Sequence, residues 1–137
     1  IAKIGSANSQ YRLTLVGTAD NVFFIQCGIA PTGSATVTDN STLTNYTSGV
    51  WRHLACVSND TDIRLYVDGA LASTPLAHTT GIFNGNADIA IGRLGSVNTQ
   101  YFDGVIDEVA IFNGALTADE IADIYQNGIT GNKGASD

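Results

Sequence analysis

The C-terminal part of the chain constrains its fold more than any other stretch. Residues 102–112 form an extended run rich in Val, Ile and Phe, a composition that favours a long β-strand. A single strong helix signature follows directly. Strand patterns dominate the rest of the sequence, so this closing pair of elements predicts an all-β architecture with one short C-terminal helix.

The helix is predicted by several local signals that agree. Thr117 and Glu120 have the spacing of a capping box, in which each side chain bonds the backbone N–H of the other residue. Gly128 supplies a C-terminal stop. These signals predict a helix over residues 118–127. Its apolar face, which would pack on the sheets, comprises Ile121, Ile124 and Tyr125.

Alternating and β-branched runs predict strands through most of the chain. A first hairpin is expected from Tyr11–Gly17 and Val22–Cys27, and a second from Trp51–Ser58 and Ile63–Asp68. Asp68-Gly69 is a strong tight-turn dipeptide, because both residue types enter positive φ more readily than most. Further strands are expected at Ser34–Thr38, Ile89–Gly92 and Phe102–Phe112, with a polar loop at Asp39–Gly49.

Composition limits the class of protein and the partners it can have. The 137 residues suit a single domain, and 44% hydrophobic against 14% charged residues indicates a globular chain. A net charge of −7 disfavours nucleic acid and anionic membrane surfaces. No apolar run approaches the ~20 residues of a membrane span. The absence of Met predicts a processed product or a piece of a larger polypeptide.

Two blocks of the sequence resemble laminin-G-like domains. Residues 51–57 and 63–69 are similar to the central hairpin of that family, and residues 104–125 to its closing strand and helix, a pattern shared with pentraxins. The resemblance implies an antiparallel two-sheet jelly-roll sandwich of the concanavalin A-like type, with the domain over residues 1–128 and a tail over 129–137. Family members usually carry strands before the point where this chain begins. The domain is therefore expected to be N-terminally incomplete, with those strands lost with a parent polypeptide or supplied by another chain.

No catalytic constellation is predicted, although some jelly rolls of this superfamily cleave glycans with two carboxylates on one strand. The chain has two Glu, of which Glu120 belongs to the helix cap and Glu108 points to the opposite strand face from Asp107. Asp60 and Asp62 lie in a turn, where solvated acids are ordinary. His53 is interpreted as a structural or surface residue. The chain is expected not to be an enzyme.

Asp107 and Glu108 lie in an apolar run and need partners, because an unpaired buried charge is costly. One reading pairs Glu108 with Arg52, Arg64 or Arg93 and gives Asp107 backbone N–H donors. The other is a structural calcium site, since similar domains bind an ion through an acid of the last strand and backbone carbonyls. Asp107 is thus the candidate metal ligand and Ca²⁺ the candidate cofactor.

Cys27 and Cys56 lie in the two different hairpins. If those strands are neighbours, as the resemblance implies, a cross-strand disulfide is geometrically feasible. Two buried free thiols are the alternative. Three sites match the N-glycosylation pattern, which matters only if the source glycosylates its exports: Asn40, Asn45 and Asn59.

The leading functional hypothesis is a non-catalytic binding module of a secreted, cell-surface or virion protein that recognises glycan or protein. A glycan site needs an exposed aromatic platform, and the candidates are Trp51, Tyr11, Tyr46, Tyr66 and Tyr101, with Trp51 expected in the core. The alternative is a structural subunit of an extracellular appendage, filament or capsid, completed by neighbouring chains. A glycosidase fragment ranks third.

Overall fold

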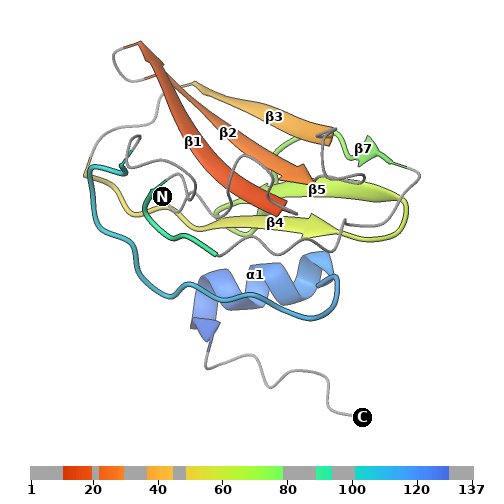
Figure 1. Ribbon diagram of the computed structural model, residues 1–137. Coiled ribbons are helices and arrows are strands. Elements are labelled where there is room, and N and C mark those ends of the chain that lie inside the picture. Colours follow the sequence, from red (N-terminus) through yellow and green to blue (C-terminus); the bar gives the residue numbers. More distant parts are fainter. Residues whose placement is uncertain are drawn as a thin grey trace.

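The computed structural model describes residues 11–19, 22–29, 37–44, 49–78, 89–93 and 101–129. Within them the chain forms two antiparallel sheets and one helix. The sheets lie over one another, and α1 lies below the second (Figure 1). The coarse prediction of an all-β fold with one C-terminal helix is confirmed. Residues 34–36 of the strand predicted at Ser34–Thr38 lie outside the described residues, as does the predicted tail beyond Ile129.

The first sheet contains the predicted N-terminal hairpin. Strand β1 (Tyr11–Ala19) pairs antiparallel with β2 (Val22–Ile29), with Leu13 opposite Cys27. The outer strand of this sheet, β3 (Val37–Thr44), pairs with the other edge of β2. β3 largely replaces the polar loop predicted from Asp39 onward. That prediction was wrong because the second edge of β2 offers backbone N–H and C=O groups along its whole length. A segment can pair with these groups even where its apolar and polar residues do not alternate.

The second sheet is built around β5 (Asp62–Val67). It pairs with β4 (Leu54–Ser58), with β6 (Ala70–Leu71) and, at its start, with β7 (Leu76–Ala77). The β4–β5 connection is held by the Asn59 side chain. Its Oδ1 accepts hydrogen bonds from the backbone N–H groups of Thr61 (2.8 Å) and Asp62 (2.7 Å). This Asx-type turn lies where the second hairpin was predicted.

Strand β5 buries side chains on both of its faces, because successive side chains alternate between them. Ile63 and Leu65 are fully buried against β2, where they meet Ile25, Cys27 and Ile29. Tyr66 points to the other face, where it packs with Val57 and Ile121 of α1. The structure is therefore layered as sheet, sheet and helix.

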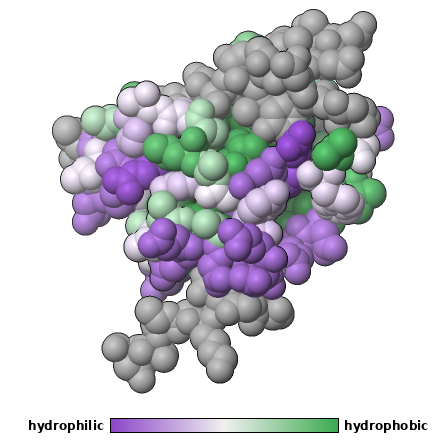
Figure 2. All heavy atoms as spheres, turned by 180° about the vertical axis from the view of Figure 1, so that it is seen from behind, coloured by the Kyte–Doolittle hydropathy of each residue, from purple (hydrophilic) through white to green (hydrophobic). Residues whose placement is uncertain are grey.

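Helix α1 (Ala118–Asn127) has the bounds that the sequence predicts. Glu120 N–H donates to Thr117 Oγ1 (3.3 Å), and Glu120 Oε2 accepts from Thr117 N–H (2.7 Å), so the capping box is formed. Gly128 ends the helix with φ 76°, and its N–H donates to the Ile124 carbonyl (2.9 Å). The lower part of the molecule, where α1 lies, is hydrophilic, whereas apolar atoms are exposed above it (Figure 2).

Two predicted strands are not formed. Residues 89–92 and 102–112 belong to neither sheet. The two segments are in contact, since Phe102 N–H donates to the Gly92 carbonyl (2.8 Å). Beyond it the chain runs past α1 outside both sheets (Figure 1). High β-propensity alone did not produce a strand here, because a strand also requires a neighbour with free backbone groups.

Candidate functional site

The most constrained polar cluster lies at the turn between β5 and β6. Asp68 and Gly69 both have positive φ, 50° and 79°, and they form a two-residue loop between the paired residues Val67 and Ala70. This is the backbone pattern of a type I′ hairpin turn, which matches the right-handed twist of the strands. The tight turn predicted from the Asp-Gly dipeptide is confirmed.

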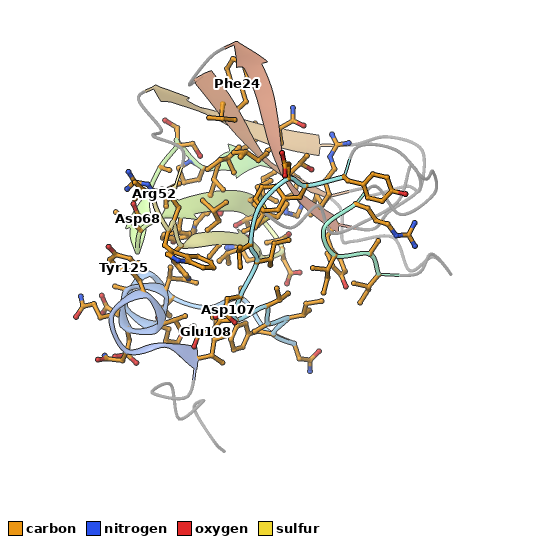
Figure 3. The ribbon with its side chains drawn as sticks, turned by 90° about the vertical axis from the view of Figure 1, so that its left-hand side faces the viewer. Phe24, Arg52, Asp68, Asp107, Glu108 and Tyr125 are labelled. Atoms are coloured by element: carbon orange, nitrogen blue, oxygen red, sulfur yellow. A yellow bond between two sulfur atoms is a disulfide. The ribbon has the colours of Figure 1, made fainter. Side chains whose placement is uncertain are left out.

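The Asp68 carboxylate fastens this turn to the segment that leads into β4. Its Oδ1 accepts the backbone N–H of His53 (3.0 Å), and its Oδ2 forms an ion pair with Arg52. A backbone hydrogen bond joins the same two residues, since Asp68 N–H donates to the His53 carbonyl (2.9 Å). Arg52 and Asp68 lie together near Tyr125 in Figure 3. One carboxylate thus orders two segments of the second sheet.

Helix α1 covers the same turn with Tyr125. A Cβ added to Gly69 would lie 3.0 Å from Tyr125 Cδ1 and 3.2 Å from its Cβ, so the aromatic side chain packs directly on the glycine. The His53 ring lies beside Tyr125, with ring centroids 5.8 Å apart. No local sequence pattern indicates this contact. The nearest hint was an aromatic residue on the predicted apolar face of the helix.

His53 is half-buried within this cluster, and burial lowers the pKa of its imidazole below the usual value. The Asp68 and Glu108 carboxylates oppose that shift but do not cancel it. His53 is therefore mainly neutral at pH 7. Its Nδ1 is buried without a hydrogen-bond partner among the described residues. His53 was interpreted as a structural or surface residue, and its packing against Tyr125 agrees with the structural reading.

The two acids of the C-terminal run are exposed. Asp107 Oδ1 accepts the N–H of Glu108 (2.8 Å), which agrees with the reading in which Asp107 takes backbone donors. Glu108 has φ 50°, so the strand alternation that placed the two acids on opposite faces does not apply. The carboxylate of Glu108 approaches Gly128, with Oε1 3.4 Å from a Cβ built there. The labels of Asp107 and Glu108 mark this position near the helix in Figure 3.

Three arginines were predicted as partners of Glu108, and two of them form ion pairs with other carboxylates instead. Arg52 pairs with Asp68, and Arg64 Nε lies 2.7 Å from Asp62 Oδ1. Arg64 Nη2–H donates to Asp62 Oδ2 (3.0 Å), and this hydrogen bond is the main reason that the pKa of Asp62 lies below its usual value. Asp62 is the first residue of β5 and forms an ion pair with Arg64, so its prediction as a solvated turn acid was wrong.

Among the described residues, no three or more His, Cys, Asp or Glu side chains lie close enough together to hold a metal ion. Calcium is bound in proteins by six to eight oxygens, including backbone carbonyls. The predicted site offers one carboxylate, that of Asp107. This carboxylate already accepts a backbone N–H. Calcium at Asp107 stays a prediction.

Cys27 and Cys56 form a disulfide, with Cα atoms 5.5 Å apart. It joins β2 to β4, so it links the two sheets rather than neighbouring strands of one sheet. The bond lies in the core, because Cys27 is fully buried beside Ile63 and Leu65. Of the two alternatives, bonded cysteines and free thiols, the structure contains the first.

The aromatic candidates for a glycan platform divide by exposure. Trp51 is 65% exposed and Tyr101 is 64% exposed, whereas Tyr66 is buried and Tyr11 packs against the core. Tyr46 lies outside the described residues. The expectation that Trp51 belongs to the core was wrong, because β4 begins only at Leu54 and leaves Trp51 ahead of the strand.

Two packed antiparallel sheets, a capped C-terminal helix and an inter-sheet disulfide define a mainly β domain. A laminin G family model, described as the concanavalin A-like lectin/glucanases superfamily, matches residues 1–122. The chain belongs to this superfamily, as the sequence resemblance implied. No curated protein sequence matches it significantly.

Among solved structures, the chain is similar to a crystal structure of an S-layer domain-containing protein (residues 221–444) from Clostridium thermocellum ATCC 27405. The identity is 24% and the TM-score 0.50, over 88% of this chain. The match spans 58% of the length of that solved chain. At this identity the likeness concerns the fold. Among the described residues, no helix is both long and apolar enough to cross a membrane.

Proposed function

We propose that the chain is a non-catalytic binding module of a secreted, surface or virion protein, built on a jelly-roll sandwich, and that it recognises glycan through exposed aromatic side chains. The observation that carries this proposal is the exposure of Trp51 (65%) and Tyr101 (64%). Flat aromatic faces combine a large apolar contact area with a polar edge, which suits the apolar faces of sugar rings. The inter-sheet disulfide supports an extracytoplasmic location, since such bonds persist in oxidising compartments.

The absence of catalysis is part of the proposal and rests on the positions of the two glutamates. Glu120 is occupied by the helix cap, where its Oε2 accepts the N–H and the hydroxyl of Thr117 at 2.7 and 2.9 Å. Glu108 lies at a left-handed backbone position near the helix end. A retaining glycosidase needs two carboxyls ~5–5.5 Å apart that are free to reach substrate. Glu120, held in the helix cap, does not suit that role.

A glycan array tests this proposal with wild-type protein, in calcium and in chelator. Trp51→Ala and Tyr101→Ala should each weaken binding by about tenfold or more, because each removes a stacking face. Trp51→Phe keeps a ring and should retain most of the affinity. Leu71→Ala, at another exposed apolar residue, is the matched control. Absence of binding to any glycan overturns the lectin proposal, and unchanged binding by both alanine variants overturns the aromatic platform.

Calcium at Asp107 is proposed as a structural ion of this module. An exposed carboxylate such as that of Asp107 is the kind of oxygen ligand that Ca²⁺ takes. Calcium should then raise the melting temperature of the wild type and leave that of Asp107→Asn unchanged. Identical melting of wild type in calcium and in chelator would remove Asp107 as a ligand.

A second candidate function is a structural subunit completed by neighbouring chains. The observation that favours it is the run 101–112, which joins neither sheet although its composition suits a strand. A missing neighbour strand would explain why it stays outside. Molecular mass in solution across a range of concentrations tests this function, and a lone monomer at every concentration argues against assembly from identical chains.

A further inference from the structure

The chain contains three Asn-Gly dipeptides, at 84–85, 113–114 and 127–128, of which the first lies outside the described residues. An asparagine that precedes glycine can react with its own backbone, because glycine has no side chain to hinder the approach of its nitrogen to the asparagine amide carbon. The reaction requires that these two atoms meet in the right orientation. The structure around each dipeptide therefore decides whether it reacts in the folded protein.

The dipeptide at the end of α1 is held by two hydrogen bonds. Asn127 Nδ2 donates to Asp123 Oδ1 (2.6 Å), which directs the amide along the helix. Gly128 N–H donates to the Ile124 carbonyl (2.9 Å) as part of the helix C-cap. The nitrogen that would attack is therefore engaged, and the amide that it would attack is bound to another side chain.

The dipeptide at 113–114 has open surroundings. Asn113 and Gly114 are both exposed, and they lie in a bend outside the two sheets and ahead of α1. Apart from its chain neighbours, nothing lies within 4 Å of a Cβ built on Gly114, and its φ is not positive. The neighbouring structure thus leaves room for the backbone rotation that brings the Gly114 nitrogen to the Asn113 side chain.

The reaction of such a dipeptide balances with water as the only co-reactant. The Gly114 nitrogen loses its proton to a base in water and forms a bond to Cγ of Asn113, while the Cγ–Nδ2 bond breaks and the amide leaves as ammonia. A water molecule then opens the resulting succinimide ring at either of its carbonyls. Opening at one carbonyl gives aspartate, and opening at the other gives isoaspartate, whose side-chain carbon becomes part of the backbone.

We propose that Asn113 is a site of spontaneous deamidation in the folded protein, through a succinimide formed with Gly114, and that the C-cap of α1 protects Asn127. Each conversion adds one negative charge to a chain whose net charge is −7. The isoaspartate product also lengthens the backbone that leads to Leu116, which packs against the cluster that contains Ile121. This modification goes beyond the proposed function, and neither the glycan site nor assembly depends on it.

Ageing of the full chain in heavy-oxygen water at mildly alkaline pH tests the proposal. Peptide mapping by mass spectrometry, with fragmentation that distinguishes aspartate from isoaspartate, should find both products at Asn113, each with one heavy oxygen. Asn113 should convert at least about tenfold faster than Asn127, because the C-cap must open before Asn127 reacts. In the reduced, denatured chain the two residues should convert at rates within about threefold of each other, because the fold no longer distinguishes them.

Two substitutions beside Asn113 separate the role of Gly114 from that of general exposure. Gly114→Ala should slow conversion of Asn113 by at least about tenfold, because the added methyl group hinders the attacking nitrogen. Its unfolding midpoint should match that of wild type, since the Cβ meets open space. Ala115→Gly is the matched control, because it changes an exposed neighbour and keeps the dipeptide. It should leave the rate at Asn113 within about twofold of wild type.

The remaining outcomes are decisive in the same experiments. Equal conversion of Asn113 and Asn127 in the folded protein overturns the proposal, as does conversion of Asn113 more than about tenfold slower in the folded than in the denatured chain. Aspartate without isoaspartate indicates direct hydrolysis and overturns the succinimide route, and so does an undiminished rate in Gly114→Ala. If Gly114→Ala does not fold, the comparison of folded with denatured wild type decides. The glycan array is independent of these results, so their failure leaves the lectin proposal intact.

Discussion

At the scale of single residues, the glycine at position 69 is fixed by two separate requirements. Its φ of 79° disfavours any side chain, and Tyr125 fills the space that a Cβ would need. Gly49 is the matched control, since its φ is 84° and nothing lies within 4 Å of an added Cβ. Gly49→Ala should cost about 1 kcal/mol of unfolding free energy and Gly69→Ala about 2–3 kcal/mol. Denaturant titration measures both; equal losses would mean that Tyr125 does not pack on the turn.

Asp68 also has two roles at this turn, which two substitutions separate. Asp68→Asn keeps an acceptor for the His53 N–H and tolerates positive φ, but it removes the charge that pairs with Arg52. Because that pair is partly exposed, the loss should stay below about 1 kcal/mol. Asp68→Ala removes the acceptor and the turn preference as well, and should cost about 1–3 kcal/mol. Equal unfolding free energies for the two variants would contradict a role for the His53 hydrogen bond.

At the scale of elements, the capping box makes the stability of α1 depend on pH. Thr117→Ala should lower the unfolding free energy by about 1 kcal/mol, because the N-cap acceptor is lost. The bonds from Thr117 to the Glu120 carboxylate hold its pKa below the usual 4.5. A depressed folded-state pKa stabilises the fold above the unfolded value, and this contribution is lost as pH falls from about 4.5 through the folded pKa.

Glu120→Gln removes the titrating group and isolates this effect from that of Asp62, whose pKa is also lowered. The difference in unfolding free energy between wild type and Glu120→Gln should therefore shrink as pH falls below about 4.5. Denaturant titrations at a series of pH values measure it. A difference that is constant through this range would show that the cap bond is absent in solution.

The elements also show which parts of the fold the sequence can predict. Helix 118–127, the Asn59 turn and the Asp68-Gly69 turn depend on contacts within a few residues, and all three form where predicted. The strand at 102–112 was wrong, because its partner cannot be recognised from its own pattern. β3 was largely missed for the complementary reason, since its position depends on β2.

The candidate site follows the same division. The acid and glycine of the turn were recognised, but the approach of Tyr125 joins residues 56 positions apart and left no local pattern. Exposure of Trp51 was equally unpredictable, because it depends on where β4 begins rather than on the tryptophan itself. Local chemistry was predictable from the sequence, whereas the side chains that meet across the fold required the arrangement of the sheets.

At the scale of the whole molecule, the Cys27–Cys56 disulfide cross-links the two sheets. Cys27 and Cys56 are separated by 29 positions, so their disulfide closes a long loop of the unfolded chain. Loop-closure entropy predicts a stabilisation of roughly 3–4 kcal/mol for such a loop. The sheets otherwise meet through apolar contacts of β2 with β5, among them Ile25, Ile63 and Leu65. Reduction should therefore loosen the packing between sheets without removing the hairpins within each sheet.

The Cys27→Ala/Cys56→Ala variant tests this division of roles. It should lose roughly 3–4 kcal/mol of unfolding free energy and respond no further to reductant, whereas wild type in reductant should fall to a similar value. Hydrogen exchange should accelerate most in β2 and β5, since the core between the sheets opens first, while α1 keeps its local cap. Thiol titration of denatured, unreduced wild type should find no free thiol. A wild type whose unfolding midpoint ignores reductant would show that apolar contacts alone hold the two sheets together.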